Sequence, residues 1–133
     1  MTNRVHLIFR SINGQKPELL LGDLKRFTSN AVVKAIIGNP NESRKNWMLN
    51  QFMKAAAKST NVHEYQFWRH DDRSIEIWSN KVMAEKIEYI HLNPVKAGFV
   101  YKPEDYVYSS AIDYCGEKGM LSDVVIFREQ EDT

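Results

Sequence analysis

Residues 79–93 read SNKVMAEKIEYIHLN, and a proline follows at position 94. Ser79 or Asn80 can cap a helix, because a short polar side chain accepts a hydrogen bond from the first free backbone N–H groups. Pro94 disfavours helical geometry at the residue before it. The apolar residues recur at the spacing of one helix face, which would turn toward a core; they are Met83, Ile87 and Ile90. The segment therefore predicts a helix over residues 81–92.

This helix carries a tyrosine and an asparagine four residues apart, Tyr89 and Asn93. Side chains at that spacing are neighbours on a helix surface. A phenol beside an amide oxygen can serve as a nucleophile beside a metal ligand. The same spacing also suits a half-buried tyrosine with an asparagine that closes the helix, so spacing alone leaves both interpretations open.

Outward from this helix, the pattern alternates between strand and helix signals. Residues 4–10 alternate in polarity and predict a strand, and residues 65–69 and 74–78 predict a hairpin around a polar turn. Helices are expected over residues 18–37, 42–58 and 109–114, and residues 124–127 are expected to be a last strand or an ordered tail. The prediction is one α+β domain over residues 1–133, with an antiparallel sheet packed with helices.

Composition fits an ordinary globular domain. The 133 residues are 43% hydrophobic and 26% charged, and 18 Lys and Arg against 17 Asp and Glu give a net charge of +1. That balance is not the strongly basic one of a general nucleic-acid binder, so any DNA site must be a local patch. Cys115 is the single cysteine, and no apolar run approaches a membrane span. We expect a cytoplasmic protein that does not bind membranes.

Several basic and aromatic residues are candidates for contacts with DNA. The expected helix over residues 18–37 carries Lys25, Arg26 and Lys34, and the next carries Arg44 and Lys45. Solvated helix faces are an equal alternative for these five. Trp68 and Trp78 suit stacking on unpaired bases, but burial in a core is the commoner use of tryptophan. The second helix is also expected to bury Trp47. His63, His70 and His91 are expected to be solvated or locally hydrogen-bonded.

The segment after the helix adds a more specific signal. Residues 89–100 read YIHLNPVKAGFV, followed by PEDY at 103–106, YSSA at 108–111 and DY at 113–114. This string closely resembles the signature of the REP-associated tyrosine transposases, relatives of the smallest insertion-sequence transposases. The resemblance covers nearly the whole chain, because Ser43-Arg44, Trp47 and Phe67-Trp68 also match that family.

The resemblance implies a ferredoxin-like α+β fold in which a His-hydrophobic-His strand faces a helix-borne tyrosine. In that family the tyrosine attacks a phosphate of single-stranded DNA beside a hairpin and becomes joined to the 5′ end. A divalent ion, Mg²⁺ or Mn²⁺, assists the leaving oxygen. Carried over, Tyr89 is the nucleophile, Asn93 stands in for the third metal ligand, and His6 is the second histidine.

The chain departs from the family in two ways. Arg4 stands where the first histidine belongs, and a guanidinium offers no lone pair to a metal and stays charged. Relatives also carry an earlier strand and helix before this motif. We expect the fold to lack that first strand and helix, and the resulting open sheet edge to favour a homodimer.

The expected function is therefore that of a single-strand DNA transposase whose activity is weak or lost, with His6 and Tyr89 across one cleft. The alternatives are a non-catalytic remnant that still binds single-stranded or hairpin DNA, and a decayed reading frame whose fold survives only as a dimer. Metal binding is expected to be weak because of Arg4. The expected DNA-binding residues are Arg4, Lys86, Lys96, Lys25, Arg26 and Arg44.

Overall fold

The computed structural model describes residues 3–60 and 64–128, and the chain divides into two compact units. The insert unit is the continuous segment Arg10–Ser74. The tyrosine unit, named for Tyr89, joins the N-terminal residues up to Phe9 to the chain from Ile75 onward. The tyrosine unit is thus built from two pieces of chain, with the insert unit between them in sequence.

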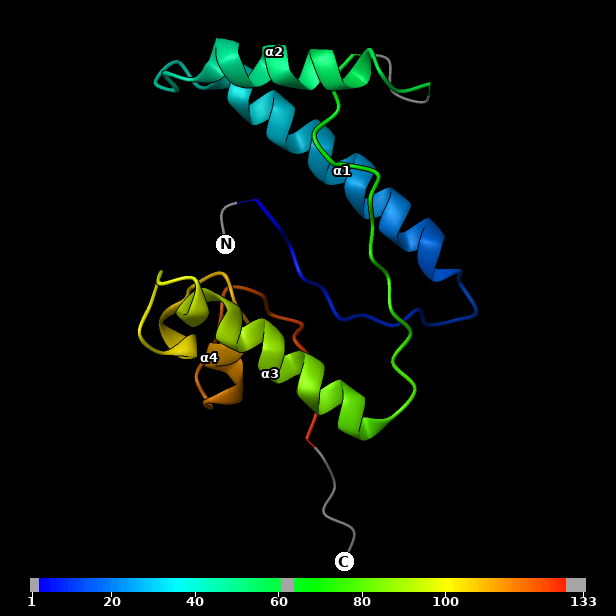
Figure 1. Cartoon of the computed structure of the whole chain (residues 1–133), viewed down its shortest axis with the longest axis vertical. Coiled ribbons are helices and arrows are strands. Elements are labelled where there is room, and N and C mark those ends of the chain that lie inside the picture. The colour runs from blue at the N-terminus through cyan, green and yellow to red at the C-terminus, as the bar shows by residue number, and fades with distance from the viewer. Residues whose placement is uncertain (1–2, 61–63, 129–133) are drawn as a thin grey trace, which may run out of the picture. The chain divides into compact units, whose positions relative to one another are not determined.

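Every regular element in the described residues is helical (Figure 1). The predicted antiparallel sheet, and with it the ferredoxin-like α+β fold, is wrong. Residues 4–10 have no strand partner, residues 65–69 and 74–78 do not pair, and residues 124–127 form no strand. A two-stranded hairpin is marginal without a third strand or other packing, so β-forming sequence alone does not make a sheet. The elements are α1 (Pro17–Gly38), α2 (Lys45–Ala56), α3 (Asn80–Lys96), the short 3₁₀ helix η1 (Pro103–Asp105) and α4 (Ala111–Tyr114).

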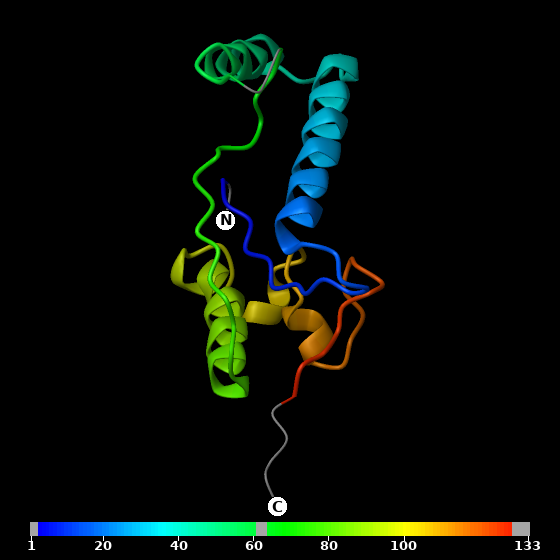
Figure 2. The same ribbon diagram turned by 90° about the vertical axis from the view of Figure 1, so that its right-hand side faces the viewer.

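In the insert unit, α1 matches the predicted helix and α2 begins three residues later than predicted. Pro17 opens α1, where its missing N–H is not needed. Before α2, the Glu42 carboxylate accepts the backbone N–H of Arg44 at 2.9 Å, so these residues form a turn. The buried residue of α1 is Val33, and the buried residue of α2 is Ala56. In Figures 1 and 2, α2 lies across the C-terminal end of α1.

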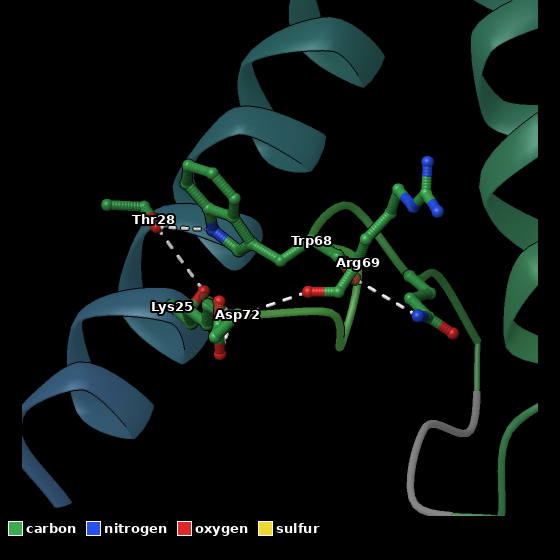
Figure 3. A network of polar contacts seen from close by, with 6 residues as sticks. Lys25, Thr28, Trp68, Arg69 and Asp72 are labelled. Carbon is green, nitrogen blue, oxygen red and sulfur yellow. Dashed lines mark hydrogen bonds and ion pairs between the residues drawn. The ribbon is translucent and has the colours of Figure 1, made fainter. Parts of the chain in front are cut away.

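The segment predicted to form the hairpin is held to α1 by polar contacts instead (Figure 3). The indole N–H of Trp68 donates to the Thr28 hydroxyl at 2.8 Å. Lys25 forms an ion pair with Asp72 and also donates to the carbonyl of Arg69 at 3.3 Å. The residues predicted as a polar turn therefore supply a partner for an α1 lysine rather than a strand reversal.

Two of the three tryptophans are not where the sequence places them. Trp68 is half-buried, as expected for a packed residue. Trp78 is 80% exposed and Trp47 is 62% exposed, so the prediction that both are core residues is wrong. For Trp47, amphipathic spacing identifies a helix face but does not determine which residues of that face find a packing partner. Trp78 lies in the predicted strand 74–78, which does not form and so gives it no sheet to pack in.

In the tyrosine unit, α3 begins where predicted and ends later. The Ser79 hydroxyl accepts the Val82 N–H at 3.2 Å, which caps the helix. The helix does not stop at Pro94 but runs through it to Lys96. It ends in a Schellman motif: Gly98, at a φ of 75°, donates to Val95 at 2.9 Å, and Phe99 donates to Pro94 at 3.0 Å. Glycine tolerates this positive φ, so the stop signal is Gly98 rather than the proline.

Candidate functional site

The structure brings His6 and Tyr89 into contact. Their ring centroids are 5.8 Å apart and the ring planes meet at 88°, an edge-to-face arrangement. Tyr89 lies in the middle of α3 and is 50% exposed, and His6 is also exposed. The expected proximity of these two residues is therefore observed within the tyrosine unit. Their roles as nucleophile and ligand stay predictions.

Asn93 lies one helical turn after Tyr89 and is half-buried. Its side-chain nitrogen is buried and has no hydrogen-bond partner among residues 3–60 and 64–128. An amide nitrogen donates and cannot bind a cation, so the group turned inward here is a donor. A buried donor without a hydrogen-bond partner lowers the stability of the fold, so the Asn93 side chain carries a cost here.

The side chains near Tyr89 do not fit a divalent metal ion. The described part of the chain holds no group of three or more His, Cys, Asp or Glu residues placed to bind one. The expected ligands are one imidazole, His6, and one amide, Asn93, whereas Mg²⁺ is usually bound through carboxylates and phosphates. Arg4 adds a fixed positive charge two residues from His6. The metal expected from the family resemblance therefore has no matching set of donors here.

The expected DNA-binding residues fall into two classes. In the insert unit, the three candidate cations each pair with an acid: Lys25 with Asp72, Arg26 with Asp23 and Arg44 with Glu42. Lys45 donates to the carbonyl of Ile37 at 2.8 Å, and Lys34 is exposed. The Arg44 backbone N–H, and after it the Arg44 side chain, lower the pKa of Glu42. The positive charges of Lys25, Arg26 and Arg44 are therefore partly neutralised by neighbouring carboxylates.

The candidate cations of the tyrosine unit are not compensated in this way. Arg4, Lys86 and Lys96 form no ion pair within the described ranges. Lys86 precedes Tyr89 by three residues and Lys96 follows it by seven, so both lie near the tyrosine's face of α3. Positive charge is thus available on both sides of Tyr89 along the helix.

The other signature residues hold the chain after α3 in place. His91 Nε2 lies 3.0 Å from the Ser110 hydroxyl, and the His91 and Tyr114 ring centroids are 4.9 Å apart. The Tyr114 hydroxyl accepts the Phe127 N–H at 3.0 Å. Burial lowers the pKa of His91, which favours the neutral ring. His91 is locally bonded, as expected, His70 is exposed, and His63 lies outside the described residues.

A cavity of about 400 Å³ opens beside this cluster. Its wall includes Glu88 and His91 from α3, with Glu104, Ala111 and Tyr114 from the segments that follow, but not Tyr89. The cavity is therefore separate from the His6–Tyr89 pair.

Sequence reasoning missed a row of aromatic rings beyond α3. Phe99 and Tyr106 stack with centroids 6.4 Å apart, and Tyr106 and Tyr108 meet edge-on at 5.8 Å. Tyr101, between them in sequence, is 97% exposed. The density of aromatic residues over 99–108 was the available signal, but only the geometry shows three of them in series.

Comparison with family models, with curated proteins and with solved structures gives no match to this chain. Within the described part of the chain, no helix has the length and apolar character needed to span a membrane. The residues of the tyrosine unit, and the resemblance of their sequence pattern, are what point to a function.

Proposed function

We propose that this chain cuts and rejoins single-stranded DNA through a covalent bond between Tyr89 and the 5′ phosphate of the cut strand. The single observation that carries the proposal is the contact of the exposed Tyr89 ring with His6. A phenol can act as a nucleophile only where a phosphate can reach it and its proton can leave. The resemblance of residues 89–114 to the tyrosine transposases supplies the reaction class.

The chemistry needs only the residues of this site. The Tyr89 hydroxyl oxygen attacks phosphorus, a new O–P bond forms, and the bond from phosphorus to the 3′ oxygen breaks. The phenol proton passes to a base, for which we assign the His6 imidazole. The imidazolium so formed gives a proton to the 3′ oxygen, which leaves as a hydroxyl. Attack by a 3′ hydroxyl on the phosphotyrosine reverses the step and restores Tyr89.

Arg4, Lys86 and Lys96 are assigned to the phosphates of the strand. Where the resembling family has a metal-binding histidine, Arg4 offers a planar set of N–H donors that suits phosphate oxygens. The proposed steps use no metal ion. The net charge of +1 gives little general attraction to duplex DNA, so recognition must be local. The preferred substrate is a DNA hairpin with an unpaired flank. The acting form of the protein is a homodimer in the reducing cytoplasm, where Cys115 stays a free thiol.

The test is a covalent adduct. A labelled hairpin oligonucleotide with an unpaired flank is incubated with the wild type and with Tyr89→Phe, then separated on a denaturing gel. We expect a shifted protein–DNA band from the wild type and none from Tyr89→Phe, which lacks the attacking oxygen. Excess chelator should leave the band in place. Equal bands from both proteins, or none from either, would exclude Tyr89 as the nucleophile.

The second candidate is a non-catalytic DNA-binding remnant, favoured by the poor fit of the site to the family's metal. Hairpin binding that survives Tyr89→Phe, with no adduct from either protein, would select it. A gel-shift series with hairpin, linear single-strand and duplex oligonucleotides at fixed salt supplies the binding measurement.

A further inference from the structure

We propose that the exposed rings after α3 form a stacking platform for unpaired bases of the strand that Tyr89 attacks. The aromatic platform consists of the exposed Phe99, Tyr101 and Tyr108, together with the half-buried Tyr106 that packs against Phe99 and Tyr108. The inference rests on the proposed function, and it deepens it by assigning the residues that hold the single-stranded flank.

The platform presents ring surface to solvent rather than to a core. Tyr101 is 97% exposed, Tyr108 75% and Phe99 50%. Phe99 and Tyr106 stack at an interplanar angle of 29°, and Tyr108 abuts Tyr106 at 73°. Phe99 and Tyr108 are each held against Tyr106, so the exposed surfaces of these two rings can stack on bases with little ordering cost.

The platform follows directly after the end of α3 in the chain. The Phe99 N–H is bonded to the Pro94 carbonyl, which fixes the chain as it leaves the helix. Tyr89 and Lys96 lie two turns apart on the same face, about 10 Å along the axis. Along the chain, Lys96 and then Phe99, the first ring of the platform, follow Tyr89 within ten residues.

Charge around the platform favours a nucleic acid over an uncharged apolar partner. Lys96 and Lys102 are exposed and form no ion pair in the residues that the structure describes. Glu104 lines the cavity beside His91, while the exposed Asp105 and the negative end of α3 oppose phosphate. Lys96 sits in the last turn of α3, where it offsets that negative end. Flat bases joined by phosphates match both the rings and these lysines.

The experiment measures stacking and affinity in the full-length chain. An oligonucleotide hairpin carries the fluorescent base 2-aminopurine in its unpaired flank, and titration gives both Kd and quenching. The variants are Tyr101→Ala and Tyr108→Ala, with Tyr101→Phe and Tyr101→Leu as a matched pair. Val125→Ala is the control for loss of an exposed apolar side chain, since Val125 is 85% exposed in the same unit.

We expect each alanine variant to weaken binding about 5- to 100-fold and to reduce quenching, because stacking on one ring supplies that much affinity. Tyr101→Phe should keep wild-type binding, and Tyr101→Leu should not, because leucine retains apolar area without a π face. Val125→Ala should change nothing. An RNA hairpin of the same sequence tests whether the platform distinguishes the sugar.

The outcomes separate this inference from the proposed function. An adduct at Tyr89 with binding unchanged in both alanine variants would overturn the platform alone. Ring-dependent binding with no adduct would overturn the cleavage proposal and keep the platform. No binding to any oligonucleotide, or rings covered by a second copy of the chain in solution, would overturn the platform as well.

Discussion

At the scale of single residues, the chain differs from the pattern it resembles at Arg4, which stands two residues before His6. An imidazole at position 4 would give the site two neutral nitrogen ligands, but the guanidinium there gives it a permanent charge. Repulsion of a unit charge at about 4 Å is near 1 kcal/mol in water and greater where solvent is excluded. The same charge that opposes a cation favours the phosphate of a DNA strand.

Replacing Arg4 with histidine is expected to raise the affinity for Mn²⁺. The wild type should bind Mn²⁺ weakly in isothermal titration, and Arg4→His should bind it at least about fivefold more tightly, since removing a unit charge at close range is worth about 1 kcal/mol or more. The double variant Arg4→His, His6→Ala is the control and should lose the gain. Tight binding of Mn²⁺ by the wild type that depends on His6 would contradict the assignment of Arg4.

The resemblance of two short stretches of sequence predicted that His6 and Tyr89 lie close together, and their rings are in contact. Their roles stay predictions. The sequence did not identify which cations are compensated. Lys25 meets Asp72 across 47 positions of sequence, and nothing local to either residue indicates the other. Local motifs can be read from a single chain, whereas long-range pairs depend on how the elements pack.

At the scale of elements, the helices were predictable and the strands were not. A helix satisfies its backbone within one segment, so periodicity and caps are enough to locate α1 and α3. A strand needs a partner elsewhere in the chain, and residues 4–10 and 65–78 have none in the described structure. The predicted start of α2 was wrong because the Glu42 side chain accepts a backbone hydrogen bond and forms a turn before the helix.

The hydrogen bond between Thr28 and Trp68 is expected to stabilise the insert unit. Thr28→Val removes the acceptor of a part-buried indole N–H and should lower the free energy of unfolding by about 1 kcal/mol. Thr28→Ser keeps the hydroxyl and should cost less. Urea unfolding followed by tryptophan fluorescence measures both. Equal stability of the valine variant and the wild type would show that the bond contributes nothing net.

At the scale of the whole molecule, burial is sparse. Among the described residues the buried ones are Val33, Ala56, Pro94 and Ala111, while large apolar side chains such as Phe27 are exposed, at 73%. The predicted reason for self-association was an open strand edge, and the described residues contain no strand. Exposed apolar surface is a separate reason, because such surface commonly marks an interaction site.

The chain is expected to associate with itself, most simply as a symmetric dimer. Sedimentation velocity at micromolar concentration should give the mass of two chains, and serial dilution should return one. Phe27→Ser tests whether α1 contributes to the contact, with Lys34→Ser as a control for an exposed polar position on the same helix. A single species of 15.5 kDa at every concentration would rule self-association out.

The division of the tyrosine unit into two pieces of chain has a consequence for connectivity. The aromatic platform and Tyr89 lie on one uninterrupted length of polypeptide, whereas His6 reaches them only across the whole of residues 10–74. A protease cut in the exposed stretch around Ile75 would leave the aromatic platform and the proposed nucleophile, Tyr89, on one fragment and His6 on the other. The proposed strand capture would thus stay on one fragment, while the proposed cleavage would require two fragments that only non-covalent contacts join.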